Sequence, residues 1–153
     1  MEIVQGGAEL LTNSVFNDIE LICTEGFKLE PEGRIFNLGR FREIILNILD
    51  LPGSVVFLVM DKHGICHGAL IGIITPAVST LDFIGTEFVW RVGPGGKGFG
   101  MKLLKRFIDW CGKNGATHIV ITSGHGNGMQ SRTAEMFRSL DFKPFTEHWI
   151  RKV

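Results

Sequence analysis

The sequence predicts a single α/β domain with a central mixed sheet and helices packed on both of its faces. Two amphipathic helical patterns come first, three long apolar runs follow, and a further helical pattern separates the third run from a short fourth one. Because these strand-like runs are apolar at nearly every position, both faces of the sheet should be covered. Runs joined by tight turns pair antiparallel and runs joined by a crossover helix pair parallel, so the sheet should be mixed.

The composition fits one ordinary globular domain over residues 1–153, with 44% hydrophobic residues to build a core. Sixteen Lys and Arg residues balance sixteen Asp and Glu residues, so the net charge gives no reason to expect a nucleic-acid or membrane partner. The chain has no apolar run of the roughly 18–20 residues that span a bilayer, and its first ten residues lack the features of a signal peptide. We therefore expect a cytoplasmic protein.

The first half of the chain predicts a short strand and two helices. Residues 1–5 form the candidate strand, and residues 8–23 carry apolar side chains every three or four positions up to a stop at Gly26. The same period returns from Leu38 to Ile48 and ends at Pro52 and Gly53, which cannot continue a helix.

The middle of the chain predicts a hairpin and a third long strand. Residues 54–61 and 65–74 are apolar and rich in β-branched residues, with a turn between them, and residues 81–92 form the next run. Three cysteines, Cys23, Cys66 and Cys111, have no paired spacing, so we expect buried thiols and neither a disulfide framework nor a metal site.

After residue 92 the pattern predicts a helix from residue 98 to a stop at Asn114 and Gly115. A short buried strand over 118–123 and a glycine-rich loop over 124–128 should follow. A helix over 129–140 and an extended segment over 142–153 complete the expected order.

Five glycines stand within the eight residues 93–100, between a predicted strand and a predicted helix. Glycines allow close approach of a ligand to the backbone, and the start of a helix offers free N–H groups to an anion, so this segment should bind phosphate. A Walker loop is excluded because Gly98 follows Lys97, where that loop needs Ser or Thr, and Arg91 stands five residues before Gly96.

A dinucleotide-binding loop is an alternative, because Gly93, Gly95 and Gly98 have the spacing of its fingerprint. Only about 60 residues follow this segment, however, and the next predicted strand ends in Thr122, Ser123 and Gly124 without a carboxylate for a ribose. This alternative predicts that NAD or FAD protects the protein against thermal unfolding.

The pattern Gly95-x-x-Gly98-x-Gly100, after an apolar strand and before a leucine-rich helix, resembles the acetyl-CoA loop of the GNAT superfamily of N-acetyltransferases. The expected order of elements is also that of the superfamily, with the similarity extending over about residues 54–145. Residues 86–94 are further similar to the branch encoded by tailed phages.

The resemblance implies an acetyl-CoA-dependent N-acetyltransferase with a GNAT-like fold. Its acceptor would be a small-molecule or protein amine that attacks the thioester directly. Homodimerisation is left open, and a phage-encoded protein would act in the host cytoplasm.

The resemblance also implies roles for individual residues. Glu87 is the best candidate for the general base, because it interrupts an otherwise apolar strand next to the proposed cleft, and Asp82, His118 and His125 are weaker candidates. Water, or a hydroxyl such as that of Ser123 or Ser131, would protonate the departing thiolate. The cofactor would contact Trp90, Val92, Gly95, Gly96, Lys97, Gly98, Phe99, Gly100, Met101 and Phe137.

Two positions depart from the superfamily pattern. Gly95 stands where the loop usually begins with Gln or Arg, and Phe137 stands where a tyrosine often protonates the leaving thiolate. Phenylalanine has no proton to give. A second hypothesis is therefore a catalytically inactive CoA-binding or structural protein, such as a phage virion or assembly component.

Overall fold

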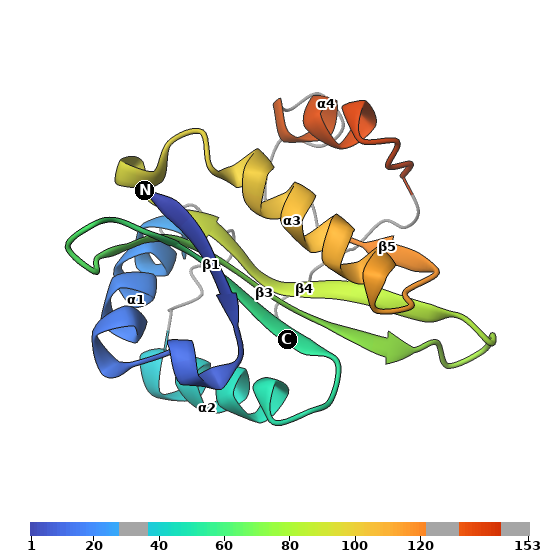
Figure 1. Cartoon of the computed structure of the whole chain (residues 1–153), viewed down its shortest axis with the longest axis horizontal. Helices are drawn as coiled ribbons and strands as arrows, with labels where there is room; N and C mark the ends of the chain where they lie inside the picture. Colours follow the sequence, from blue (N-terminus) through green and yellow to red (C-terminus); the bar gives the residue numbers. More distant parts are fainter. Residues whose placement is uncertain (28–36, 122–131, 145–153) are drawn as a thin grey trace, which may run out of the picture.

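A computed structural model of the chain describes residues 1–27, 37–121 and 132–144, and its course is shown in Figure 1. The strands are β1 (Glu2–Gly6), β2 (Ser54–Met60), β3 (Cys66–Pro76), β4 (Phe83–Val92) and β5 (His118–Val120). The α-helices are α1 (Asn13–Phe27), α2 (Leu38–Leu49), α3 (Gly100–Lys113) and α4 (Arg132–Ser139), with single 3-10 turns η1 (Ala8–Leu10) and η3 (Pro94–Gly96). No helix in these ranges is long and apolar enough to cross a membrane.

The strands form one mixed sheet in the order β1-β2-β3-β4-β5. The first four strands pair antiparallel with their neighbours, and β5 pairs parallel to β4 after the crossover through α3. The predicted mixed sheet is thus confirmed.

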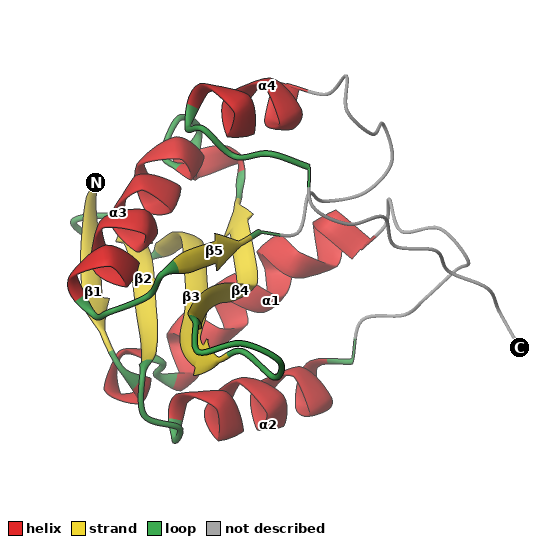
Figure 2. Ribbon diagram, turned by 90° about the vertical axis from the view of Figure 1, so that its right-hand side faces the viewer, coloured by secondary structure: helices red, strands yellow, loops and turns green. Residues whose placement is uncertain are grey.

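Helices cover both faces of this sheet, as Figure 2 shows from the side: α1 and α2 lie on one face, and α3 with α4 lies on the other. Each face has its own apolar core. The core under α1 and α2 includes Phe16, Ile19, Ile45, Leu58 and Ile71. The core under α3 includes Phe57, Leu70, Leu103, Phe107 and Cys111.

Strand β2 explains why the run of residues 54–61 is apolar throughout. Val56 and Leu58 belong to the core under α1 and α2, whereas Phe57 and Val59 belong to the core under α3. Because successive side chains of a strand point to opposite faces, a strand buried on both sides needs apolar residues at every position.

Side chains of helix α3 pack directly on the backbone of the sheet. A Cβ at Gly72 of β3 would lie 2.5 Å from Cε2 of Phe107, and a Cβ at Gly85 of β4 would lie 2.5 Å from Sγ of Cys111. Glycine at these two strand positions therefore lets side chains of α3 rest directly on the backbone of the sheet.

Two predicted helix starts differ from the observed ones. The first helix begins at Asn13 rather than residue 8, because residues 8–10 form a 3-10 turn and the Thr12 hydroxyl accepts the Val15 N–H at 3.3 Å. The third helix begins at Gly100 rather than at residue 98. Gly98 has φ +89°, which no right-handed helix contains.

Three further predictions concern segments that lie wholly or partly outside the described residues. These are the end of the strand predicted over 118–123, the loop predicted over 124–128 and most of the extended segment predicted over 142–153. The described part of that last segment, residues 142–144, is not a strand.

All three cysteines are free and buried, as predicted. Burial raises the pKa of Cys23 and of Cys66 to about 11 and the pKa of Cys111 to about 12. Thiols of this kind stay protonated near neutral pH and are poor nucleophiles.

The raised thiol pKa values predict that the free energy of unfolding falls above about pH 9. The unfolded chain loses its thiol protons there while the folded chain keeps them, so each thiol contributes a loss of up to about 1.4 kcal/mol per pH unit until its folded pKa is reached. Below about pH 9 the thiols are protonated in both states, so their full contribution to the free energy of unfolding is present. Urea unfolding between about pH 8 and pH 10 measures the slope, and the chain has no tyrosine to titrate in this range. The slope should be shallower in Cys111→Ala, and an unchanged slope would contradict the assignment.

Candidate functional site

The glycine-rich segment forms a tight turn between β4 and α3, which we call the glycine turn (residues 93–99). It leaves β4 at Val92, makes the 3-10 turn η3 and enters α3 at Gly100. The Gly93 N–H donates to the carbonyl of His67 on β3 at 2.9 Å. Within the turn, the N–H of Gly96 donates to the Gly93 carbonyl and that of Phe99 to the Gly96 carbonyl, both at 3.0 Å. The turn is therefore fixed to the start of β3 and closed by its own backbone.

The glycines of this turn are required for two different physical reasons. Gly98 has a left-handed φ of +89°, and the space around a Cβ there would be open. Gly96 instead packs tightly, because a Cβ would lie 2.6 Å from the carbonyl oxygen of His67 and 2.7 Å from Cγ1 of Val92. Gly95 packs in the same way against the His67 ring. This packing buries Gly96, whereas Gly95 and Gly98 remain exposed to solvent.

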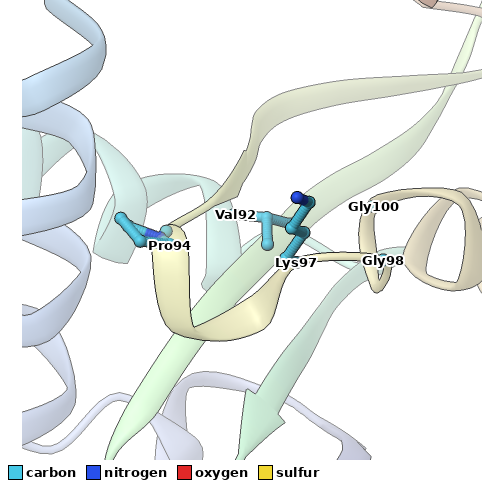
Figure 3. Close-up of a pocket in the computed structure, with 6 residues that line it drawn as sticks. Val92, Pro94, Lys97, Gly98 and Gly100 are labelled. Atoms are coloured by element: carbon cyan, nitrogen blue, oxygen red, sulfur yellow. The ribbon is translucent and has the colours of Figure 1, made fainter.

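An open hollow of about 590 Å³ lies over the glycine turn, and Figure 3 shows the Lys97 side chain leaving the turn beside it. The residues that line the hollow are Val92, Gly93, Pro94, Lys97, Gly98 and Gly100. One flexible cation beside exposed backbone suits an anionic ligand better than a neutral one.

The start of α3 lies next to this hollow, and its Gly100 is one of the lining residues. Phe99 precedes the helix and makes no side-chain cap, and the Leu103 N–H is the first to close a helical turn, donating to the Phe99 carbonyl at 2.9 Å. The N–H groups of residues 100–102 come before that bond, as at every helix start. The first turn contains no acidic residue. This helix end is thus electrostatically suited to phosphate.

Within the described residues, the edge of β4 that leads to the glycine turn has no partner strand. Strand β5 pairs with β4 from Ile84 to Thr86, and no other described strand continues the ladder on that side of residues 88–92. The backbone N–H and C=O groups along this edge can pair with an extended polar ligand. An open strand edge and a phosphate-binding turn therefore form one continuous surface.

Glu87 lies where β4 and β5 part, because it directly follows the last paired residue, Thr86. It stands opposite Gly72, and residues paired across a sheet share a face, so Glu87 is on the α3 face. Its side chain is half-buried, with Oε2 buried. The next residue, Phe88, is the extra residue of a β-bulge, since Val89 pairs with Ile71 and Glu87 with Gly72.

An aromatic cluster of Trp90, Phe137 and Phe142 joins α4 to β4. The Trp90 and Phe137 rings lie 5.8 Å apart between centroids, and the Phe137 and Phe142 rings lie 5.6 Å apart. The indole N–H of Trp90 donates to the Gly100 carbonyl at 3.2 Å. Trp90 thus packs between α4 and the start of α3, and Phe137 lies beside the open part of β4.

The structure brings most of the predicted cofactor residues together. Glycine-turn residues Gly95 to Phe99 adjoin Val92, Gly100 and Met101, and Lys102 holds its Nζ 4.5 Å from the centre of the Phe99 ring. Glu87 stands about 17 Å from Val92 along β4, because each residue of an extended strand adds about 3.4 Å. Whether any of these residues contacts a cofactor stays a prediction.

The other candidate acids and bases are elsewhere or outside the described residues. Asp82 and His118 are exposed and lie 3.7 Å apart, at the end of β4 opposite the glycine turn. Hydrogen bonds from Thr80 and Thr117 lower the pKa of Asp82. Ser123 and His125 lie outside the described residues.

The sequence interpretation missed a histidine–aspartate pair, His67 and Asp61, next to the glycine turn. Nε2 of His67 lies 3.0 Å from Oδ2 of Asp61, and both side chains are mostly shielded. The hydrogen bond from His67, followed by that from the Ile65 N–H, lowers the pKa of Asp61. In the sequence Asp61 is typical of a turn and His67 is a lone polar residue in a strand, so only the fold brings the pair to the turn.

The fold matches that of known acetyltransferases across the whole chain. A scan against protein-family models and a search of curated proteins find no match. Among solved structures, a GNAT family acetyltransferase from Staphylococcus aureus has a TM-score of 0.63 at 15% identity, covering 100% of both chains. An aminoglycoside 6′-N-acetyltransferase from Acinetobacter haemolyticus has a TM-score of 0.67 at 15% identity, covering 100% of this chain and 99% of the other.

A transcriptional regulator from Bacillus halodurans has the same fold, with a TM-score of 0.74 at 15% identity over 99% of this chain and 100% of the other. The chain therefore has a GNAT-like fold, as predicted. At such identities the likeness shows the fold alone, and the function must be argued from the site.

Proposed function

We propose that the protein is an acetyl-CoA-dependent N-acetyltransferase that acetylates the amine of a small-molecule or protein acceptor. The observation that supports this most is the continuity of an open β4 edge with a phosphate-binding turn, within a GNAT-like fold. A long ligand with a pyrophosphate at one end and amide groups along an extended arm fits such a surface.

The residues at the glycine turn fit the pyrophosphate of CoA. Gly98 leaves open space where any other residue would place a strained Cβ, and Gly96 lets the turn pack against the His67 carbonyl. The uncapped start of α3 offers N–H donors, and Lys97 adds a cation. We therefore assign phosphate binding to the turn and the first residues of α3, and arm binding to the β4 edge over residues 88–92.

When bound, acetyl-CoA supplies an acetyl group activated as a thioester. The β4 edge would hold the arm of the cofactor in one orientation, so that its thioester is placed for direct attack by the acceptor amine. Glu87 takes the proton that the acceptor's ammonium group must lose before attack. Trp90 and Phe137 exclude water from one side, and a hydroxyl such as that of Ser123, or solvent, protonates the departing thiolate because Phe137 cannot.

A catalytically inactive CoA-binding or structural protein is the second candidate function, and the possibility includes a phage virion or assembly protein. Phe137 is the observation that favours it, because the ring lies beside the open part of β4 without a proton to donate. The two candidates share cofactor binding and differ in turnover.

Calorimetry with CoA and acetyl-CoA is the first test. The wild type should bind both, and Gly96→Ala should bind on the order of tenfold or more weakly, because its Cβ would push the turn away from the His67 carbonyl. Gly112→Ala is the matched control: this glycine of α3 has nothing within 4 Å of a Cβ, so binding should not change. Absence of binding by the wild type at millimolar concentration would refute the proposal.

The second test is acetyl transfer from acetyl-CoA to a broad panel of amines. Turnover of at least one amine supports the transferase, whereas CoA binding without transfer favours the inactive CoA-binding protein. Protection against thermal unfolding by NAD or FAD, with none by CoA, would instead favour the dinucleotide alternative.

A further inference from the structure

We propose that His67, oriented by Asp61, takes the place of a side chain at position 95 and positions the glycine turn for phosphate binding. The inference rests on the proposed function, because its ligand is the pyrophosphate of CoA. It assigns a role to His67 of β3 and to Asp61 of the preceding turn. Both residues are far from the glycine-rich motif in the sequence.

The first step is steric. A Cβ on Gly95 would overlap Nδ1 of the His67 ring, and it would lie 2.9 Å from Cε1 and 3.3 Å from Cγ of the same ring. The imidazole therefore occupies the volume in which a side chain of residue 95 would begin. Glycine at this position is the consequence of a ring supplied by another strand.

The second step concerns the backbone of the same residue. The His67 carbonyl accepts the Gly93 N–H at 2.9 Å, and the missing Cβ of Gly96 allows the turn to lie against that carbonyl. His67 thus contacts the turn through its ring at Gly95 and through its carbonyl at Gly93. One residue of β3 thus contacts the glycine turn at two positions, before η3 and within it.

The third step fixes the ring itself. Asp61 holds Nε2 of His67 through Oδ2 at 3.0 Å, while its Oδ1 accepts the N–H groups of His63 and Ile65 at 2.8 and 3.0 Å. Because a carboxylate only accepts, Nε2 carries the hydrogen and Nδ1 is the nitrogen that faces the turn. The carboxylate is immobilised by the β2–β3 turn, so the ring cannot rotate away from Gly95 without losing this bond.

The test exchanges the ring for a side chain at position 95 and measures dissociation constants for CoA, with inorganic pyrophosphate as a competitor. His67→Ala should raise the dissociation constant for CoA about tenfold, because it removes the ring that contacts Gly95 together with its hydrogen bond to Asp61. Adding Gly95→Gln to His67→Ala should restore most of the affinity, because the new side chain enters the vacated space. Gly95→Gln alone should weaken binding, because the ring is still present.

Gly95→Gln should therefore lower the CoA affinity of the wild type and raise that of His67→Ala. If His67 had a merely structural role, Gly95→Gln would lower the affinity in both proteins. Asp61→Asn should weaken CoA binding less than His67→Ala, and circular dichroism checks that each variant is folded. If His67→Ala does not fold, His67→Asn with and without Gly95→Gln gives the same comparison.

Unchanged CoA affinity in the His67 variant, or equal losses from Gly95→Gln in both backgrounds, would overturn the inference while leaving the proposed function intact. A wild type that binds neither CoA nor pyrophosphate would overturn the proposed function, and the inference with it.

Discussion

Glu87→Gln is expected to lower kcat for acetyl transfer by about 10²- to 10⁴-fold without changing the dissociation constant for CoA. Glu87 follows the last β4 residue paired with β5, and the bulge at Phe88 comes directly after it. A carboxylate at this position can take a proton from the acceptor amine, whereas an amide of the same shape cannot. Steady-state kinetics with any amine accepted by the wild type, together with calorimetry for CoA, measure the two quantities.

The pH dependence separates proton transfer from a general effect of the substitution. As the pH approaches the pKa of the acceptor amine, more of the amine is already deprotonated, so the gap between wild type and Glu87→Gln should narrow. Glu43→Gln, on the exposed side of α2, is the control and should behave as the wild type. A constant gap at every pH would argue against a general base, and an unchanged kcat would eliminate Glu87 from the mechanism.

Phe107→Ala is expected to lower the free energy of unfolding by about 3–5 kcal/mol. The Phe107 side chain is 0% exposed and lies between α3 and the backbone of β3, where Gly72 leaves room for its ring. It also stacks on Trp110, with ring centroids 6.0 Å apart. The backbone of β3 at Gly72 borders the cavity left by alanine, and a paired strand moves little. Relaxation around the cavity should therefore recover little of the lost free energy of unfolding.

Urea unfolding at neutral pH measures this loss, and Phe83→Ala is the matched control. Phe83 begins β4 with about half of its side chain exposed, so its truncation should cost much less. Phe107→Leu, which keeps most of the volume, should be intermediate and secures a folded protein if the alanine variant unfolds. Equal losses for Phe107→Ala and Phe83→Ala would contradict the described packing of α3.

The main elements of the fold could be predicted from the sequence because the core is periodic. Strand β2 has apolar residues on both faces, and α3 repeats its buried positions Leu104, Phe107 and Cys111 at helical spacing. Element starts were less predictable. The 3-10 turn at residues 8–10 and the left-handed Gly98 depend on local hydrogen bonds and backbone angles that apolar periodicity does not report.

The candidate site could be predicted only where its residues are neighbours in the sequence. The glycine turn and the adjoining helix start are continuous, so spacing alone indicated them. The bulge at Phe88 depends on register against β3, and the contact between His67 and Gly95 joins segments that only the sheet brings together. Neither leaves a local pattern, since His67 and Gly95 each have an ordinary appearance in isolation.

The bulge in β4 also bears on aggregation. Over residues 88–92 the described strands leave one edge of β4 without a partner strand, and Phe88, at the start of this edge, is 52% exposed. A long regular edge with an exposed aromatic residue is a template on which a strand of another chain can add. The extra residue interrupts the regular spacing of N–H and C=O groups at the first residues of that edge and bends the strand locally. The same irregularity that sets Glu87 apart therefore makes this edge a poorer template for a strand of another protein chain.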